Sequence, residues 1–365
     1  MKRIVIVGGG SAGVMFTNRM RREFPEDELE LTVIERSDKH YFQPAFTLMA
    51  FGLDEGEDVV KSTKDLFYEG VNLIADSATR VNPENNTITT TKHGTLSYDH
   101  LVIATGAKLN FTKPAGMKEG LNKGENVFTF YTMNGALKLR DAFSQLKGGT
   151  IVSMSSEAPI KWPSGPINFI LMAENRMRML GVRDKYKFVL STPMPSVSPE
   201  QSYQESLNSI LDSKGIEVVN NFAPEEVDYE KGSVKSYGGE KVNFDLLSII
   251  PPNEGEKVIR ESDKLGDAAG WVNCDKYHLL SKQYSNIYAI GDAISGAVKT
   301  MTTARVQAKV LTCRMKALLI GKEPTAKCKP DVLFPVRARS KSVFAENNYD
   351  ALKPLYWTLM LRGLL

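Results

Sequence analysis

Apolar and polar positions along the chain repeat an alternating strand and helix pattern. Residues 2–7 (KRIVIV) form a short, β-branched apolar run that ends at Gly8, and a helical pattern follows from Ser11 to Phe24. Further strands are predicted at 29–35 and at 99–104, and hairpin strands are predicted across 71–92 around the turn at 82–85. A buried strand, a glycine turn and a helix in this order indicate an α/β fold with parallel strands.

A second α/β unit is predicted to begin near Gly148. It has strands at 150–154, 186–191 and within 217–250, and helices near 167–180 and 200–214. A last strand at 286–290 and a helix at about 301–319 follow. Because 365 residues exceed the usual size of one core, we expect two Rossmann-like three-layer domains. The expected division is 1–108 with 275–322, then 109–274, then a C-terminal appendage at 323–365.

Composition narrows the chemistry. The net charge of +3 is small for this length, so the composition does not predict a nucleic-acid surface. Three scattered cysteines and four histidines form no CxxC pair or Cys/His cluster, so no metal site is predicted. Electron-transfer chemistry would therefore need an organic cofactor. We find no secretory signal and no apolar run of ~20 residues, so we expect a cytoplasmic protein, with a peripheral position on the inner face of the membrane left open.

The turn after the first strand carries the most specific nucleotide signal. Residues 8–13 (GGGSAG) match GxGxxG between a strand and a helix, and Glu35 ends the next strand. Gly8 permits the tight turn, Gly10 lets the backbone approach a pyrophosphate, and Gly13 allows close helix–strand packing. The helix start offers N–H groups and a positive dipole end to phosphates. We expect Glu35 to accept hydrogen bonds from a ribose.

Two later segments separate FAD from NAD. Ala104-Thr105-Gly106 and Ile290-Gly291-Asp292-Ala293 resemble the ATG and GD motifs of the two-dinucleotide-binding flavoproteins, whose fold is glutathione-reductase-like. The resemblance implies bound FAD, with Asp292 hydrogen-bonded to the ribityl chain. The residues expected to bind FAD are Gly8, Gly10, Ser11, Ala12, Gly13, Glu35, Arg36, Gln43, Pro44, Ala78, Ala104, Thr105, Gly106, Gly291, Asp292, Lys299 and Thr300.

Longer motifs point to one branch of that superfamily. Residues 40–44 (HYFQP), 268–272 (AAGWV) and 355–363 (LYWTLMLRG) resemble the sulfide:quinone oxidoreductase family over almost the whole chain. The resemblance implies two-electron transfer from a small donor through FAD to a quinone. The loop at 155–166 (SSEAPIKWPSGP) has no second GxGxxG, and its tryptophan and prolines would crowd a pyrophosphate. We therefore expect the second unit to bind no NAD(P)H.

The chain departs from this family at the cysteines that handle sulfur. Trp162 stands at one family cysteine position and Leu333 at the other, and neither side chain can form a persulfide. Cys328 lies about five residues upstream of Leu333. It is a minor candidate for a redox role, and the alternative is an inert loop thiol. Cys313 is expected to pack in the core and Cys274 to lie on the surface. The identity of the electron donor stays open. Either a donor reduces the flavin directly, or sulfide attacks the flavin without a protein thiol. Trp162 would then pack on the flavin ring and close the donor pocket.

The resemblance also implies a quinone site in the C-terminal segment. Phe334, Phe344 and Tyr356, with Trp357 nearby, are the candidate contacts, and Lys299 is a candidate to stabilise the reduced ring or a quinone oxygen. The apolar end at 353–365 fits interfacial membrane docking and equally a core or homo-oligomer contact. Two other functions remain open: a flavin-binding subunit or sensor without turnover, and an NADH:quinone-type dehydrogenase.

Overall fold

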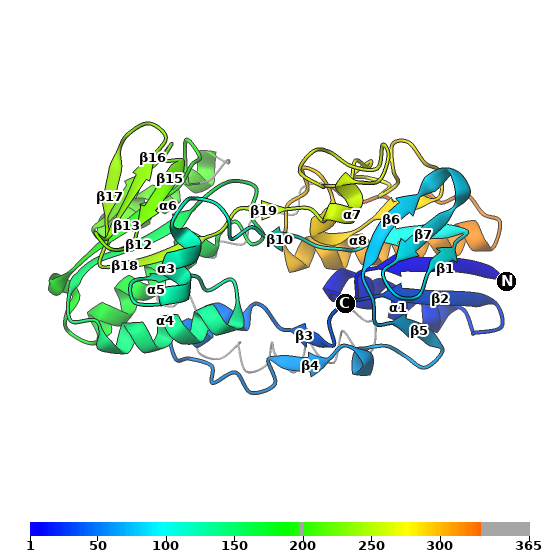
Figure 1. The fold of residues 1–365 in the computed structure, drawn as a ribbon, viewed down its shortest axis with the longest axis horizontal. Coiled ribbons are helices and arrows are strands. Elements are labelled where there is room, and N and C mark those ends of the chain that lie inside the picture. The colour runs from blue at the N-terminus through cyan, green and yellow to red at the C-terminus, as the bar shows by residue number, and fades with distance from the viewer. Residues whose placement is uncertain (198–200, 330–365) are drawn as a thin grey trace.

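The computed structural model describes residues 1–197 and 201–329, and these form two α/β units side by side along the long axis of the molecule (Figure 1). The first unit has a five-stranded sheet in the order β20-β9-β1-β2-β5, and all its strand pairs are parallel. Its strands are β1 (Lys2–Val7), β2 (Leu29–Ile34), β5 (Val71–Ile74), β9 (His100–Ile103) and β20 (Ile287–Ala289). The central strand is β1, which is paired on both sides.

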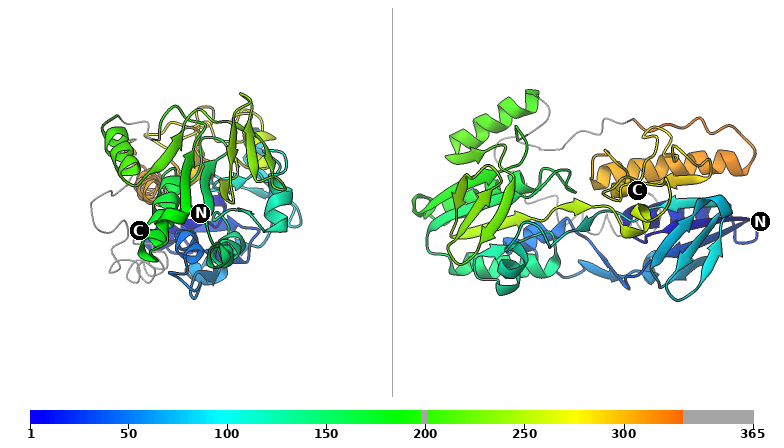
Figure 2. Two further views of the ribbon diagram at one scale, coloured as in Figure 1. Left: turned by 90° about the vertical axis from the view of Figure 1, so that its left-hand side faces the viewer. Right: turned by 45° about the horizontal axis from the view of Figure 1, so that its top comes forward.

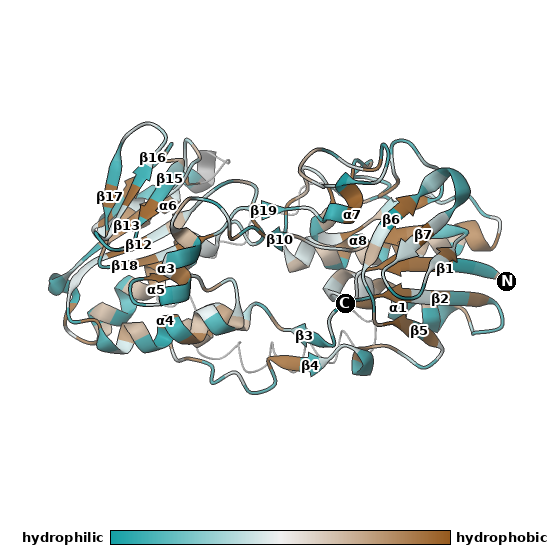
Figure 3. Cartoon of the chain, in the orientation of Figure 1, coloured by the Kyte–Doolittle hydropathy of each residue, from teal (hydrophilic) through white to brown (hydrophobic). Residues whose placement is uncertain are grey.

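Two helices and a small antiparallel sheet complete the first unit. Helix α1 (Ser11–Glu23) follows β1 directly and packs along α8 (Met301–Leu319), which Figure 2 shows beside the first sheet. The antiparallel strands are β6 (Ala78–Asn82), β7 (Thr87–Thr90) and β8 (Thr95–Ser97), with the short turn η2 (Pro83–Asn85) between the first two. Four residues of β1, Ile4 to Val7, are buried, whereas its first two are exposed, and Figure 3 shows that the strand is hydrophilic at the end nearest the N-terminus.

The second unit repeats the plan with a sheet in the order β11-β18-β12-β13-β14, again parallel throughout. Its strands are β11 (Val127–Phe128), β12 (Gly149–Ser155), β13 (Tyr186–Ser191), β14 (Ile216–Val219) and β18 (Leu246–Ile250). Its helices are α3 (Met117–Lys123), α4 (Met133–Gln145), α5 (Gly165–Met179) and α6 (Gln201–Ser213), with the turn η3 (Arg183–Lys185) before β13.

Alternating side chains give the second sheet two separate cores. Val152, Met154 and Ile249 face one way and pack with the antiparallel sheet of β15 (Pro224–Asp228), β16 (Ser233–Ser236) and β17 (Lys241–Asn243). Ile151 and Ile250 belong to the other core, which includes buried residues of α4 and α5. A period of two along each strand produces this division.

Two pairs of short strands connect the units (Figure 1). One pair is β3 (Lys39–Tyr41) with β4 (Val60–Ser62), and α2 (Ala45–Ala50) and the turn η1 (Lys64–Leu66) lie on either side of β4 in sequence. The other is β10 (Lys108–Leu109) with β19 (Asn253–Glu254). After β19 the chain contacts the first unit: α7 (Lys257–Arg260) packs on β6, and Val272 donates its N–H to Ala293 O. We therefore propose that the chain returns to the first unit at β19, rather than at residue 274 as expected from the sequence.

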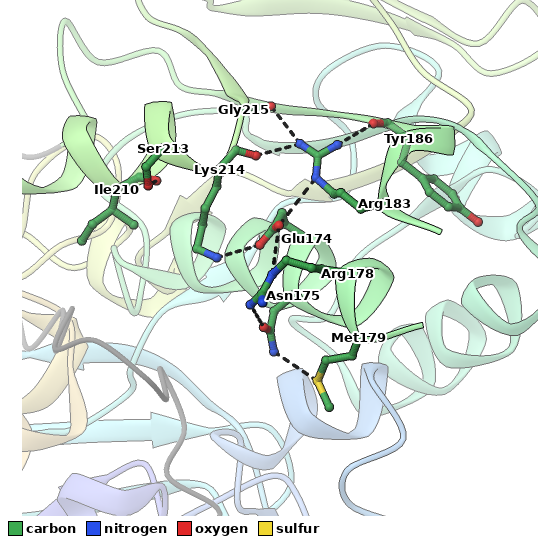
Figure 4. Close-up of polar contacts among 10 residues, drawn as sticks. All are labelled: Glu174, Asn175, Arg178, Met179, Arg183, Tyr186, Ile210, Ser213, Lys214 and Gly215. Carbon is green, nitrogen blue, oxygen red and sulfur yellow. Dashed lines mark hydrogen bonds and ion pairs between the residues drawn. The ribbon is translucent and has the colours of Figure 1, made fainter. Parts of the chain in front are cut away.

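A buried carboxylate ties the outer elements of the second unit together (Figure 4). The side chain of Glu174 on α5 is 3% exposed and lies 2.7 Å from Lys214 Nζ. The Nε atoms of Arg178 and Arg183 each lie 3.5 Å from its other oxygen. Arg183 also donates to the backbone carbonyls of Lys214 and Tyr186, at 2.7 and 2.8 Å. The network thus joins α5 to the segments that lead into β13 and β14.

Three sequence expectations need correction. Residues 71–74 are not part of a hairpin, because β5 joins the edge of the parallel sheet beside β2. Cys313 is exposed rather than in the core, and Cys274 is buried rather than on the surface. The other strand and helix predictions agree with the structure within about two residues, the usual spread of element ends. None of the described helices combines the length and apolar character needed to cross a membrane.

Candidate functional site

The turn after β1 is shaped by three glycines with different surroundings. Gly8 has φ +107°, and a Cβ there would lie 2.4 Å from Ala104 O. A Cβ on Gly13 would lie 2.0 Å from Gly8 O, so the helix can approach the strand only without a side chain. A Cβ on Gly10 would meet nothing within 4 Å. The first two glycines therefore serve packing, and the third leaves open space above the start of α1.

The start of α1 faces this space with favourable electrostatics. Gly10 is the N-cap residue, no side chain caps the helix, and its first turn carries no acidic residue. The first N–H groups of a helix have no intrahelical acceptor, and the dipole makes this end partly positive. An anionic pyrophosphate fits such a helix start. Ser11 and Ala12, both predicted cofactor residues, lie in this turn.

The segment after β2 holds the glycine turn in place. The N–H of Gly9 donates to Glu35 Oε2 at 2.7 Å, and Ser37 N–H donates to the other oxygen at 2.8 Å. On the other side, His40 Nδ1 lies 3.2 Å from Gly9 O. Burial lowers the pKa of His40 to about 4, so the ring is neutral and its Nδ1–H donates to that carbonyl. The predicted ribose residue thus lies against the turn, with Arg36 beside it in an ion pair to Glu256 at 2.7 Å.

The ends of β9 and β20 contribute the other predicted motifs. A Cβ on Gly291 would lie 3.0 Å from the Cβ of Ala12, which places this segment against the start of α1. Thr105 Oγ1 is buried and has no hydrogen-bond partner among the described residues. Asp292 is half-buried, and its carboxylate accepts no hydrogen bond from residues 1–197 or 201–329. Burial raises the pKa of this carboxyl, and the positive charges of Lys299 and Lys161 lower it in part. These unpaired acceptors and donors fit a polyhydroxy chain.

Lys299 supports the Asp292 segment from behind. Its side chain is almost fully buried, and Nζ donates to the backbone carbonyls of Asp292 and Ile294 at 2.7 and 3.2 Å. The same ammonium lies 3.7 Å from the ring centroid of Trp271. Burial lowers the pKa of Lys299 to about 8, against the opposing effect of Asp292 and Asp267. Lys299 therefore holds the loop that presents Asp292.

The loop after β12 meets this region from the second unit. Trp162 has φ +49°, and its N–H donates to Lys299 O at 2.7 Å. The Tyr131 hydroxyl donates to Lys161 O at 2.7 Å and lies 3.1 Å from Trp162 O. Lys161 Nζ in turn donates to Gln43 Oε1 at 2.9 Å. Side chains from both units and from the β3–α2 connection thus converge beside Asp292.

Some predicted residues lie apart from this convergence. Ala78 pairs with Thr90 in the antiparallel sheet, and Thr300 caps α8 by accepting from Thr303 N–H. Cys328 is buried, its pKa is raised to about 11 by burial, and its N–H donates to Tyr277 O. Its contacts therefore come from residues near Cys274 and give a redox role no support. Leu333, Phe334, Phe344, Tyr356 and Trp357 lie outside the described residues.

Sequence reasoning missed three residues of the site. Lys161 stood next to a residue of interest but was given no role, and Tyr131 and His40 were not singled out. For His40 a signal existed, because it is the first residue of the 40–44 motif and follows Glu35 by five positions. For Tyr131 and Lys161 no local signal existed, since their partners come from distant segments.

Comparison with known proteins agrees with this geometry. Residues 2–147 match the pyridine nucleotide-disulphide oxidoreductase family. The mitochondrial sulfide:quinone oxidoreductase of Dictyostelium discoideum is 28% identical over 95% of this chain and 78% of its own length. The Mus musculus protein of the same name is 26% identical over 99% of this chain and 86% of its own length. The solved sulfide:quinone oxidoreductase of Aquifex aeolicus superposes with a TM-score of 0.73 at 23% identity, covering 88% of this chain and 77% of its own. This chain is therefore an FAD-dependent oxidoreductase whose residues 2–147 match the pyridine nucleotide-disulphide oxidoreductase family, and it is similar over most of its length to the sulfide:quinone oxidoreductases.

Proposed function

We propose that this protein passes two electrons from a small donor through one bound FAD to a quinone. The observation that carries the proposal is the open space at Gly10, framed by the start of α1, Glu35 and Asp292. FAD, when bound, supplies the two-electron chemistry. The amides of the first turn of α1 bind its pyrophosphate, Glu35 accepts hydrogen bonds from its ribose, and Asp292 accepts them from its ribityl hydroxyls.

The donor side differs from that of a thiol-dependent enzyme. Trp162 lies in the loop that would face the flavin, while Cys274 and Cys328 are buried elsewhere in the first unit and Cys313 is exposed on α8. Burial raises the pKa of Cys274 to about 12, so neither buried thiol is a nucleophile at neutral pH. The donor therefore reduces the flavin without a protein thiol, and Trp162 closes the donor pocket against water.

The acceptor side is assigned to the C-terminal segment. Phe334, Phe344 and Tyr356 would line a quinone site, and the apolar stretch at 353–365 would dock on the inner face of a membrane. These residues lie outside the described part of the chain, so this assignment stays a proposal. It comes from the names of the relatives, which act on quinone, and from the aromatic and apolar character of the segment.

A substitution at Gly10 tests the cofactor site without breaking the fold. Gly10 has an extended backbone and no atom within 4 Å of a Cβ, so Gly10→Val should fold normally. Its side chain would fill the pyrophosphate space, and we expect FAD content to fall at least tenfold. Gly238→Val, at an exposed glycine outside the site, is the matched control and should keep its FAD. Normal FAD content in Gly10→Val would contradict the assigned site.

An anaerobic donor assay tests the reaction. The FAD-loaded protein is mixed in turn with sulfide, a small thiol and NADH, and the visible flavin absorbance is followed. Loss of absorbance with sulfide or the thiol, and its return on adding a short-chain quinone, would support the proposal. Rapid loss with NADH would favour an NADH:quinone-type dehydrogenase. Inertness to every donor would favour a flavin-binding subunit or sensor without turnover.

A further inference from the structure

Two lysines approach Asp292, and the structure gives their ammonium groups different surroundings. Lys299 Nζ donates to two backbone carbonyls and lies against the face of Trp271. These three partners account for its charge and for its donor capacity, since an ammonium has three N–H groups. Lys299 is therefore a positioning residue, and its three N–H groups are already occupied before any ligand binds.

Lys161 has fewer and weaker partners, and one of them is the Tyr131 ring, whose centroid lies 6.0 Å from Lys161 Nζ. Its Nζ donates to the neutral amide of Gln43 at 2.9 Å, and no carboxylate in residues 1–197 or 201–329 lies within ion-pair distance of it. The side chain is half-buried, and burial lowers its pKa although the charge of Asp292 raises it in part. A partly desolvated cation without a counter-ion is unfavourable, and an anion placed beside it relieves that cost.

The backbone around Lys161 fixes where this charge points. Its N–H donates to Asn253 Oδ1 at 2.9 Å, and its carbonyl accepts from the Tyr131 hydroxyl at 2.7 Å. The next residue, Trp162, is bonded to Lys299 O. Restraint on both sides of the residue fixes where its side chain begins, and the bond to Gln43 Oε1 holds its ammonium, as preorganised electrostatic groups require.

We propose that Lys161 supplies the positive charge that stabilises the flavin after reduction, an inference that rests on the proposed flavin site. The oxidised ring is neutral. Uptake of two electrons and one proton from the donor leaves one net negative charge on the ring, and Lys161 retains its own protons throughout. A cation fixed nearby favours the charged, reduced state and raises the two-electron potential of the bound flavin.

The test is a redox titration of FAD-loaded variants. Each protein is titrated anaerobically with dithionite against a reference dye, and FAD content is measured on the same samples. Lys161→Gln should lower the ratio of reduced to oxidised flavin at a fixed potential at least tenfold, which corresponds to about 30 mV for a two-electron couple. Lys161→Arg keeps the charge and should stay within about threefold of the wild type. Lys187→Gln removes an exposed charge near the start of β13 and should leave the flavin potential unchanged.

A second variant covers the case in which Lys161→Gln loses its cofactor. Gln43→Glu would place a carboxylate where the amide oxygen now contacts Lys161, which neutralises the charge without removing the lysine. It should lower the potential in the same direction. At least one of these two variants is expected to retain FAD. If its flavin potential equals that of the wild type, the role of Lys161 is overturned and the proposed function still stands. Failure of the wild-type protein to bind FAD would instead remove the proposed function itself.

Discussion

The turns after β1 and β12 occupy the same place in two similar sheets, yet only one is open. Each strand is central, with β9 and β2 beside β1 and β18 and β13 beside β12. Above α1, a Cβ on Gly10 would meet nothing within 4 Å. Above α5, a Cβ on Gly165 would lie 2.7 Å from Tyr131 Oη and 3.2 Å from Trp162 Cε3. The second unit thus fills with its own side chains the space that the first leaves for a dinucleotide.

Topology alone therefore does not define a nucleotide site. The second unit keeps the parallel sheet and the helix after its central strand, but its loop is bonded to Lys299 of the first unit. Its buried charge is used to hold α5 against neighbouring segments through Glu174. We propose that one unit binds the cofactor and that the other shapes one side of the same site. The predictions below test whether the two units divide their roles in this way.

The largest expected effect is on the stability of the second unit. Glu174→Gln leaves Lys214 and Arg183 without their buried counter-ion and should lower the free energy of unfolding by about 3 kcal/mol. Lys231→Gln removes one partner of the exposed pair with Asp228 and should leave the free energy of unfolding nearly unchanged. Urea unfolding gives both values. A folded Glu174→Gln protein with full FAD content but reduced stability would support separate roles, whereas loss of FAD at unchanged stability would contradict them.

Several elements could be predicted because their end signals are local. The strand at 186–191 and the helix at 301–319 have the predicted bounds, and Thr300 caps that helix as a local sequence signal would suggest. The glycine turn was equally local, because a Cβ on Gly8 or Gly13 would meet a backbone atom nearby in sequence or at the end of the neighbouring strand, whereas a Cβ on Gly10 would meet none within 4 Å. The family motifs extended this to the ends of β9 and β20, where Thr105 and Asp292 face the site.

The misplaced cysteines show two kinds of failure. For Cys313 the signal was present: buried residues of α8 recur at Ala308, Leu311 and Met315, and position 313 falls off that face. For Cys274 it was absent, because its burial depends on Cys328 and other residues distant in sequence. The same limit applied to Lys161. Lys161 matters because it interacts with Gln43 and Asp292. Both residues are distant in sequence, so no local pattern predicts these interactions.

A smaller effect compares one glycine from each turn. In Gly13→Ala the new methyl would meet the backbone oxygen of Gly8 at 2.0 Å, so strand and helix must separate. We expect a loss of about 2 kcal/mol together with weaker FAD binding. In Gly165→Ala the nearest atom is the hydroxyl oxygen at the end of the Tyr131 side chain, so a small shift of that side chain relieves the contact and the loss should be about 1 kcal/mol. Thermal unfolding measures both, and a larger loss for Gly165→Ala would show that the second turn is the more tightly packed.

The smallest effect concerns the pH dependence that His40 gives to the first turn. Burial lowers its pKa in the folded protein to about 4, below the usual value near 6.5. The unfolded chain therefore binds the proton first, so the contribution of His40 to stability is complete above about pH 6.5 and is lost as the pH falls towards 4.

His40→Gln can still donate to Gly9 O but does not titrate. Between pH 7 and about pH 5.5 the wild type should lose about 1.2 kcal/mol more than the variant, measured by urea unfolding at fixed FAD. Asp76 also weakens the fold in acid, because hydrogen bonds from His93 and Lys92 lower its pKa against the effect of burial, but both proteins retain it. The difference between them isolates His40, and parallel pH profiles would mean that its ring is not held neutral against the glycine turn.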